Sequence, residues 1–99
     1  MERELKIKIG VVKRTTNDIT SYQKEVVEEQ GKLDRYKDDE FKLKQQKESI
    51  AESEMMVRDS KKRLAVALKD LQTKIQDNVV AQQDAEVVAV IDAAKKALE

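Results

Sequence analysis

The chain has 99 residues, enough for one small domain, and its 20 basic and 20 acidic side chains leave no formal net charge. It contains no His, Cys or Pro, so zinc sites of the usual kind, thiol and histidine catalysis, and disulfide bonds are excluded. Charged residues make up 40% of the chain, proline is absent and glycine occurs only twice, which predicts long helices with a charged surface.

The first third of the chain carries an apolar residue at every seventh position. A strict seven-residue repeat keeps one seam of a helix facing a partner helix and is typical of a left-handed coiled coil. We therefore expect a first helix over about residues 3–36 and, where the pattern recurs, a second helix over about residues 40–77. The seam residues are Leu5, Val12, Ile19, Val26 and Leu33 in the first helix and Leu43, Ile50, Val57, Leu64 and Leu71 in the second.

The two heptad series predict an antiparallel hairpin. Each seam residue of the first helix pairs with one of the second so that their residue numbers always have the same sum, 76, beginning with Leu5 and Leu71. Antiparallel packing requires such a constant sum, and this one places the turn near residue 38. Asp38 or Asp39 can cap the second helix there.

A third, shorter helix is expected over about residues 83–98, with Asn78 or Asp84 as its cap. The competing possibility is one continuous helix from about residue 40 to the end of the sequence, because neither Gly nor Pro occurs between residues 76 and 84. The apolar positions of the third helix are Val87, Ile91, Ala94 and Leu98.

These elements predict an all-α fold. We expect a single domain over residues 1–99, an elongated antiparallel three-helix bundle with left-handed coiled-coil packing, two long helices and one shorter C-terminal helix. The third helix can cover only the end of the hairpin that holds Leu5 and Ile19, so the other end is a two-helix ledge. Polar residues beside the seam are either flaws that a long charged helix pair tolerates or a sign of a seam kept adaptable for a partner. They are Thr15, Thr16, Gln23 and Gln30.

Motifs for catalysis and ligand binding are missing. Gly31-Lys32 is not followed by the Ser or Thr of a phosphate-binding loop, and Asp38-Asp39-Glu40 lacks the glycine and alternating ligands of a calcium loop. We therefore predict no enzyme activity, no cofactor and no metal. Three aromatic residues are too few for a base-stacking surface, and no segment has the long apolar face that a membrane requires. Neither nucleic acid nor a membrane is expected as a partner.

Protein–protein recognition is the remaining class. Met55 and Met56 adjoin the seam where the third helix barely reaches, and methionine is common on surfaces that accept imperfectly fixed partners. The alternative is that Met56 fills a gap in the bundle and Met55 is an isolated exposed residue. Other apolar residues off the seams are Ile7, Val11, Val27, Val66 and Val79. The expected client-binding surface comprises Val11, Tyr22, Val26, Val27, Ile50, Met55 and Met56.

Several strings, in order and at compatible spacing, carry a family resemblance. The first helix holds Lys6-Ile7-Lys8-Ile9-Gly10-Val11-Val12-Lys13-Arg14 and Tyr22-Gln23-Lys24-Glu25, and the second holds Lys44-Gln45-Gln46, Glu52-Ser53-Glu54-Met55-Met56-Val57, Arg63-Leu64 and Asp70-Leu71-Gln72. Over most of residues 5–75 the chain resembles the tubulin-specific chaperone A family, also called tubulin-folding cofactor A. Family members often have Pro shortly after the Met pair, where this chain has Arg58, so the second helix is expected to be straighter here.

The resemblance implies a cofactor that acts after the cytosolic chaperonin. Such a protein captures β-tubulin folding intermediates on the way to the αβ-tubulin heterodimer without hydrolysing nucleotide. The implied partners are β-tubulin and other tubulin-folding cofactors, the chain itself being a monomer or a weak homodimer. The expected location is the cytoplasm, in association with the cytoskeleton. A generic coiled-coil scaffold or oligomerisation module is the alternative, because the heptads suit it equally well.

Overall fold

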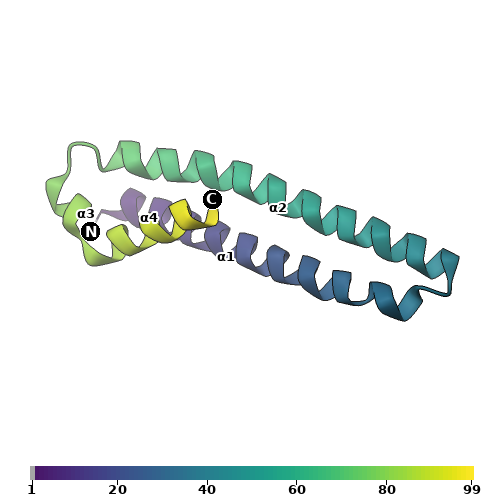
Figure 1. Ribbon diagram of the computed structural model, residues 1–99. Helices are drawn as coiled ribbons and strands as arrows, with labels where there is room; N and C mark the ends of the chain where they lie inside the picture. The colour runs from purple at the N-terminus through teal and green to yellow at the C-terminus, as the bar shows by residue number, and fades with distance from the viewer. Residues whose placement is uncertain (1) are drawn as a thin grey trace.

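Two long helices, α1 (Arg3–Gly31) and α2 (Glu40–Lys74), run antiparallel along an elongated rod (Figure 1). This computed structural model describes residues 2–99. The rod measures 60 by 21 by 18 Å. Two shorter helices, α3 (Val79–Gln83) and α4 (Ala85–Ala97), bring the chain back along one end of the pair. No strand occurs within residues 2–99, and the expected all-α fold is confirmed.

The turn between the long helices uses side-chain capping instead of glycine geometry. Asp39 caps α2 by accepting a hydrogen bond from the Lys42 amide at 3.1 Å, as one of the two expected caps. None of the residues from 2 to 99 has a positive φ, so Gly31 supplies no left-handed turn conformation. The chain reverses through a 3₁₀ helix, η1 (Leu33–Tyr36), followed by the extended backbone of Asp39.

The first helix ends earlier than expected. It was predicted to run to about residue 36, but α1 stops at Gly31. The carbonyl of Glu29 accepts a hydrogen bond from the Lys32 amide at 3.1 Å, which is the three-residue spacing of a 3₁₀ turn. It also accepts one from the Gln46 side-chain amide of α2 at 2.8 Å. These bonds satisfy the carbonyl without another α-helical turn, and the weak helix propensity of Gly31 favours the same end point.

The second helix also ends earlier, at Lys74 instead of about residue 77. The Gln82 side-chain amide donates to the carbonyls of Ile75 at 2.7 Å and Gln76 at 2.8 Å, which replaces the helical bonds these groups would otherwise need. Asn78 then caps α3 by accepting from the Ala81 amide. The alternative of one continuous helix from residue 40 onward is therefore wrong.

The expected third helix, over about residues 83–98, is α4 preceded by the short α3, which the apolar pattern did not reveal. Asp84 caps α4 by accepting from the amides of Glu86 at 2.9 Å and Val87 at 3.2 Å. Both candidate caps are thus used, Asn78 for α3 and Asp84 for α4. One carboxamide cap, Asn78, and one carboxylate cap, Asp84, follow each other closely and form this turn without Gly or Pro.

The hydrophobic core lies at the end of the rod where α4 packs on the hairpin. We call this the core half: residues 2–19, residues 60–75, α3 and α4. Lys74 contacts Glu2 at 3.0 Å, and Gln46 contacts the Glu29 carbonyl at the other end, so the antiparallel register is within one residue of the predicted sum. The buried apolar residues of the core half are Leu5, Ile9, Val12, Ile19, Leu64, Leu68, Leu71, Ile75, Ala81, Val87, Val90 and Ala94.

The remaining part of the hairpin, residues 20–59, is less well covered, and we call it the tip half. Within it Ile50 is the one buried apolar residue, whereas Leu33 and Leu43 are half-buried. Part of the seam is polar here, because the Glu29 carboxylate accepts hydrogen bonds from the hydroxyls of Ser49 and Ser53 on α2. The expected two-helix ledge is present, and α4 stops well short of it (Figure 1).

Candidate functional site

The apolar residues that the heptad pattern placed off the seams are exposed. Their exposed fractions run from 36% for Val11 to 68% for Val27. They do not form one surface, because helical spacing directs them to different sides of the rod. The six are Ile7, Val11, Val27, Met55, Val66 and Val79.

Ile50, which was expected in the client-binding surface, is not accessible to a partner. Its side chain is only 8% exposed, because its heptad position directs it toward α1 even where α4 does not reach. The expectation that Ile50 is exposed at this surface is therefore wrong. Of the other expected residues, Tyr22, Val26 and Met56 are half-buried and Met55 is 45% exposed.

A groove between α1 and α2 combines exposed apolar side chains with several charged ones, and we call it the open groove. It lies in the core half and has a volume of about 520 Å³. Ile7 and Val66 are more than half exposed along it, with exposed fractions of 55% and 63%. The groove is lined by Ile7, Lys8, Val11, Lys62, Arg63, Val66, Ala67 and Asp70.

The open groove and α4 lie on opposite sides of the same helix pair. Lys13 and Asn17 of α1 line a separate hollow together with Glu86 and Val90 of α4. At roughly 100° per residue, these α1 positions are about half a turn around the helix from the α1 residues of the open groove. The long helices therefore present two equivalent sides in the core half, one occupied by α4 and one free of any other element of residues 2–99.

The rim of the open groove is mainly basic. Lys8 comes from α1, and Lys62 and Arg63 come from α2, whereas Asp70 is the one acidic residue among the lining side chains. The Arg63 guanidinium donates to the Ser60 hydroxyl at 3.1 Å, which fixes one of these cations at the groove wall. An apolar floor between cations suits an apolar partner segment that carries acidic residues at its edges.

A second groove lies in the tip half, on the same side of the pair as α4, and we call it the tip groove. It has a volume of about 380 Å³ and begins beyond the end of α4, where the Lys61 ammonium donates to the Glu99 carbonyl at 3.4 Å. One acidic and one basic residue line it, so its charges balance. Its lining residues are Gln23, Val26, Val27, Glu54, Val57 and Arg58.

The expected client-binding residues are therefore divided between two sides of the rod. Val26 and Val27 line the tip groove, whereas Val11 lines the open groove. Tyr22 lies three helical turns after Val11, and Met56 two turns before Arg63, so both extend the side of the open groove toward the tip.

The open groove contains residues that the expected client-binding surface left out. Lys62, Val66 and Asp70 are spaced four apart, so they share one face of α2. Combined with the antiparallel register, that spacing places them opposite Lys8 and Val11, and this signal was available before the structure was known. Three further exposed apolar residues were also missed: Phe41, Val80 and Val88.

One cluster of ion pairs closes the end of the core half. The Lys74 ammonium lies 3.0 Å from a carboxylate oxygen of Glu2 and 3.0 Å from one of Glu4. The hydrogen bond from Lys74, aided by its charge, lowers the pKa of Glu4, while hydrogen bonds to Glu2 and Glu4 raise the pKa of Lys74. This cluster ties the start of α1 to the end of α2 and has a structural role.

The described surface holds two grooves that can contact another protein. Within the part of the chain that the structure describes, no group of three or more acidic side chains is placed to hold a metal ion. Between residues 2 and 99, no helix has the length and apolar character needed to cross a membrane. What the two grooves can do is bury apolar surface of a partner, which is favourable by roughly 25 cal/mol per Å².

Comparisons with known proteins agree over nearly the whole chain. The family described as Tubulin binding cofactor A matches residues 1–98. Tubulin-specific chaperone A from Gallus gallus is 37% identical over 87 residues, which is 85% of this chain and 80% of that protein. The crystal structure of tubulin-binding cofactor A from Leishmania major has a TM-score of 0.81 at 25% identity and covers 98% of this chain and 95% of that one. The crystal structure of tubulin folding cofactor A from Arabidopsis thaliana has a TM-score of 0.74 at 37% identity, with 97% and 90% covered.

Proposed function

Because this chain belongs to the Tubulin binding cofactor A family, we propose that it is a tubulin-folding cofactor that captures and stabilises folding intermediates of β-tubulin on the way to the αβ-tubulin heterodimer. The observation that carries the proposal is the family match over residues 1–98. The name of the Gallus gallus relative, a tubulin-specific chaperone, supports the same class of activity.

The mechanism that fits this chain is stoichiometric binding without nucleotide hydrolysis. A folding intermediate exposes apolar surface that the finished protein buries, and covering that surface removes it from aggregation. The grooves of the rod provide apolar side chains for this purpose, and the surrounding charged residues limit association between copies of the rod itself. Binding energy alone, without a covalent step, is sufficient for such a role.

The partners follow from the same proposal. The client is β-tubulin in preference to α-tubulin, and further tubulin-folding cofactors receive it afterwards. The cofactor acts as a monomer or a weak homodimer in the cytoplasm and associates with the cytoskeleton through its client.

The experiment is a binding assay with β-tubulin released from the chaperonin. At micromolar concentrations the purified chain should form a complex with β-tubulin that persists through gel filtration, and it should bind α-tubulin less well. Adding ATP or GTP should produce no phosphate release above that of the client alone. Absence of any β-tubulin complex, together with concentration-dependent dimerisation of the chain, would instead indicate a coiled-coil scaffold.

A further inference from the structure

The helix pair of the core half has two sides, and α4 shows what one of them accepts. Val87, Val90 and Ala94 of α4 are buried against the pair, at spacings of three and four residues. A groove between two packed helices accepts a third helix when small or branched apolar side chains enter it at this spacing. The side that α4 occupies thus shows what kind of helix this pair of helices can accept.

The open groove offers the corresponding features on the other side. Ile7 and Val11 lie one turn apart on α1, and Val66 and Ala67 face them from α2. All four are apolar, and the first three are exposed. The open groove is therefore an apolar groove formed by the same two helices that hold α4, and no other element of residues 2–99 covers it.

The charges around the open groove restrict the kind of helix that fits. Lys8, Lys62 and Arg63 stand against Asp70 alone, so the lining carries an excess of positive charge. On the filled side, Glu86 of α4 lines a hollow together with Lys13 of α1. An acidic residue on the docked helix beside a basic residue on the pair is thus an arrangement that the fold already uses.

From these observations we propose that the open groove docks an amphipathic helix of the tubulin client, with acidic residues flanking the apolar stripe of that helix. This inference rests on the proposed function, because it names the surface of the rod and the chemistry of the client segment that meet. The docked helix lies across the pair from α4, and the core half becomes a four-helix arrangement in the complex. The tip groove, whose charges balance, is not the primary site.

Two valines allow a matched test of the location. Val66 in the open groove is 63% exposed and Val27 in the tip groove is 68% exposed, and both lie inside long helices. Val66→Glu should weaken binding of chaperonin-released β-tubulin about tenfold or more, because it puts a carboxylate on the apolar floor. Val27→Glu should weaken binding at least about fivefold less than Val66→Glu, because the tip groove is not the primary site. Far-UV circular dichroism should show unchanged helicity in both variants.

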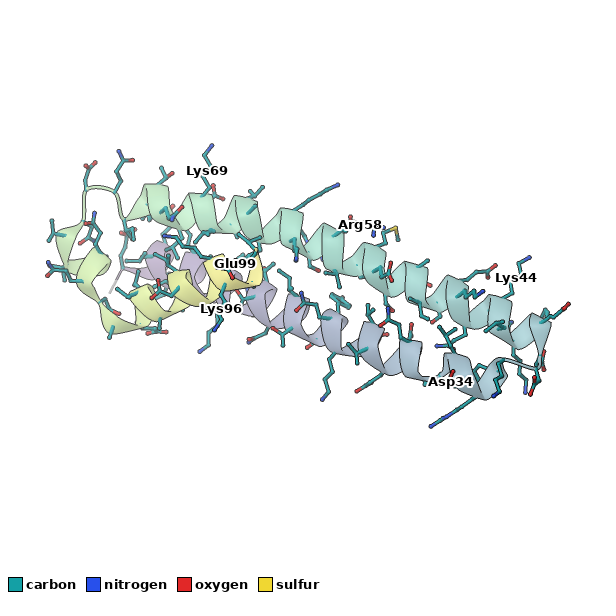
Figure 2. All side chains as sticks on the ribbon, viewed as in Figure 1. Asp34, Lys44, Arg58, Lys69, Lys96 and Glu99 are labelled. Atoms are coloured by element: carbon teal, nitrogen blue, oxygen red, sulfur yellow. The ribbon has the colours of Figure 1, made fainter. Side chains whose placement is uncertain are left out.

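A second pair of variants tests the charge argument. Lys62→Glu reverses a cation of the open groove, whereas Lys44→Glu reverses an exposed cation that projects from α2 away from α1 (Figure 2). The first variant should lose about tenfold in affinity and the second almost none. Raising the salt concentration from about 0.05 to 0.5 M should weaken wild-type binding markedly, since exposed charges are then screened. The Lys62→Glu variant should show a smaller salt dependence.

Three results would overturn the proposal while leaving the proposed function intact. The first is wild-type affinity in Val66→Glu with loss of binding in Val27→Glu, which assigns the client to the tip groove. The second is an equal change of β-tubulin affinity in Lys62→Glu and Lys44→Glu, which would contradict an acidic client helix. The third is a homodimer of the free chain, measured by sedimentation equilibrium, that Val66→Glu abolishes, which makes a second copy the occupant. If wild type binds no β-tubulin at all, the proposed function fails first.

Discussion

Replacing Leu64 by Ala should destabilise this protein far more than the same replacement at Leu43. The two leucines lie on the same helix, three heptads apart, and both belong to the seam that faces α1. Leu64 is completely buried in the core half, where α4 closes the bundle, whereas Leu43 is half-buried in the two-helix tip half. Because both changes are Leu→Ala at the same heptad position of α2, any difference in the stability they cost reflects the different packing around the two side chains.

The expected magnitudes follow from that difference in burial. Removing a fully enclosed leucine side chain forfeits its transfer free energy and leaves a cavity, so Leu64→Ala should cost about 3–4 kcal/mol. At Leu43 water can reach the vacated space and part of the side chain is already hydrated, so the cost should be about 1 kcal/mol. Domains of this size are stable by about 5–15 kcal/mol, so the first variant should lose a large share of the total.

Urea unfolding followed by far-UV circular dichroism measures both costs directly. Equal m-values for the two variants and wild type would show that unfolding stays cooperative, and the shift of the midpoint then gives the free energy lost. A Leu43→Ala variant as unstable as Leu64→Ala would refute the reasoning, because it would mean that the tip half is packed as tightly as the part that α4 covers.

Three further changes have defined expectations. Gly10→Ala should stabilise the chain by about 1 kcal/mol in thermal or urea unfolding, because a methyl group there meets no atom within 4 Å and α1 gains helix propensity. Asp84→Ala should cost about 1 kcal/mol in the same measurement, since the α4 amides, including that of Val87, lose their cap. Lys74→Met should return the pKa of Glu4, measured by NMR titration, toward 4.5. A carboxyl whose pKa is lowered in the folded state stabilises that state at pH values above its unfolded pKa, and this stability is lost as the pH falls through the folded-state pKa. Wild type should therefore lose more stability on acidification than the variant.

Much of the hairpin could be predicted from the sequence because its signals are redundant. The seven-residue period identified the seams, and their constant sum set the register that the contact between Lys74 and Glu2 bears out. Asp38 or Asp39 was predicted as the cap of α2 for independent reasons of turn chemistry, and Asp39 is the one that caps it. The family resemblance rested on strings spread along both helices, and the match over residues 1–98 confirms it.

The helix ends were harder to predict because each depends on hydrogen bonds from one glutamine side chain beyond the end of the helix. The carbonyls that close α1 and α2 are satisfied by the side chains of Gln46 and Gln82, residues that carry no special signal in a polar sequence. The short helix α3 follows from the second of these bonds together with the cap at Asn78. Since no Gly or Pro marks the turn after α2, only the folded arrangement shows where the chain leaves α2 and begins α3.

The sequence predicted the exposure of several candidate residues, but not how they are arranged around the rod. Excluding seam positions correctly identified exposed residues such as Val11, Val27 and Val66, because exposure depends mainly on the angle around one helix. Their division between two grooves depends also on the side that α4 occupies, which the apolar pattern of α4 alone does not specify. Ile50 was misassigned because the absence of a third helix was taken as exposure, although the partner helix already covers it.

The elongation of the rod has a consequence for how the molecule moves through solution. Its radius of gyration is 17.9 Å, whereas a compact chain of this length has one of about 13 Å. A single copy therefore experiences more friction than a sphere of 11.4 kDa and should elute early from a gel-filtration column, where a dimer would be expected. Light scattering or sedimentation equilibrium, which report mass independently of shape, should identify that early peak as the monomer. In the proposed complex with tubulin, the same elongation would let one small chain lie along its client while adding little mass.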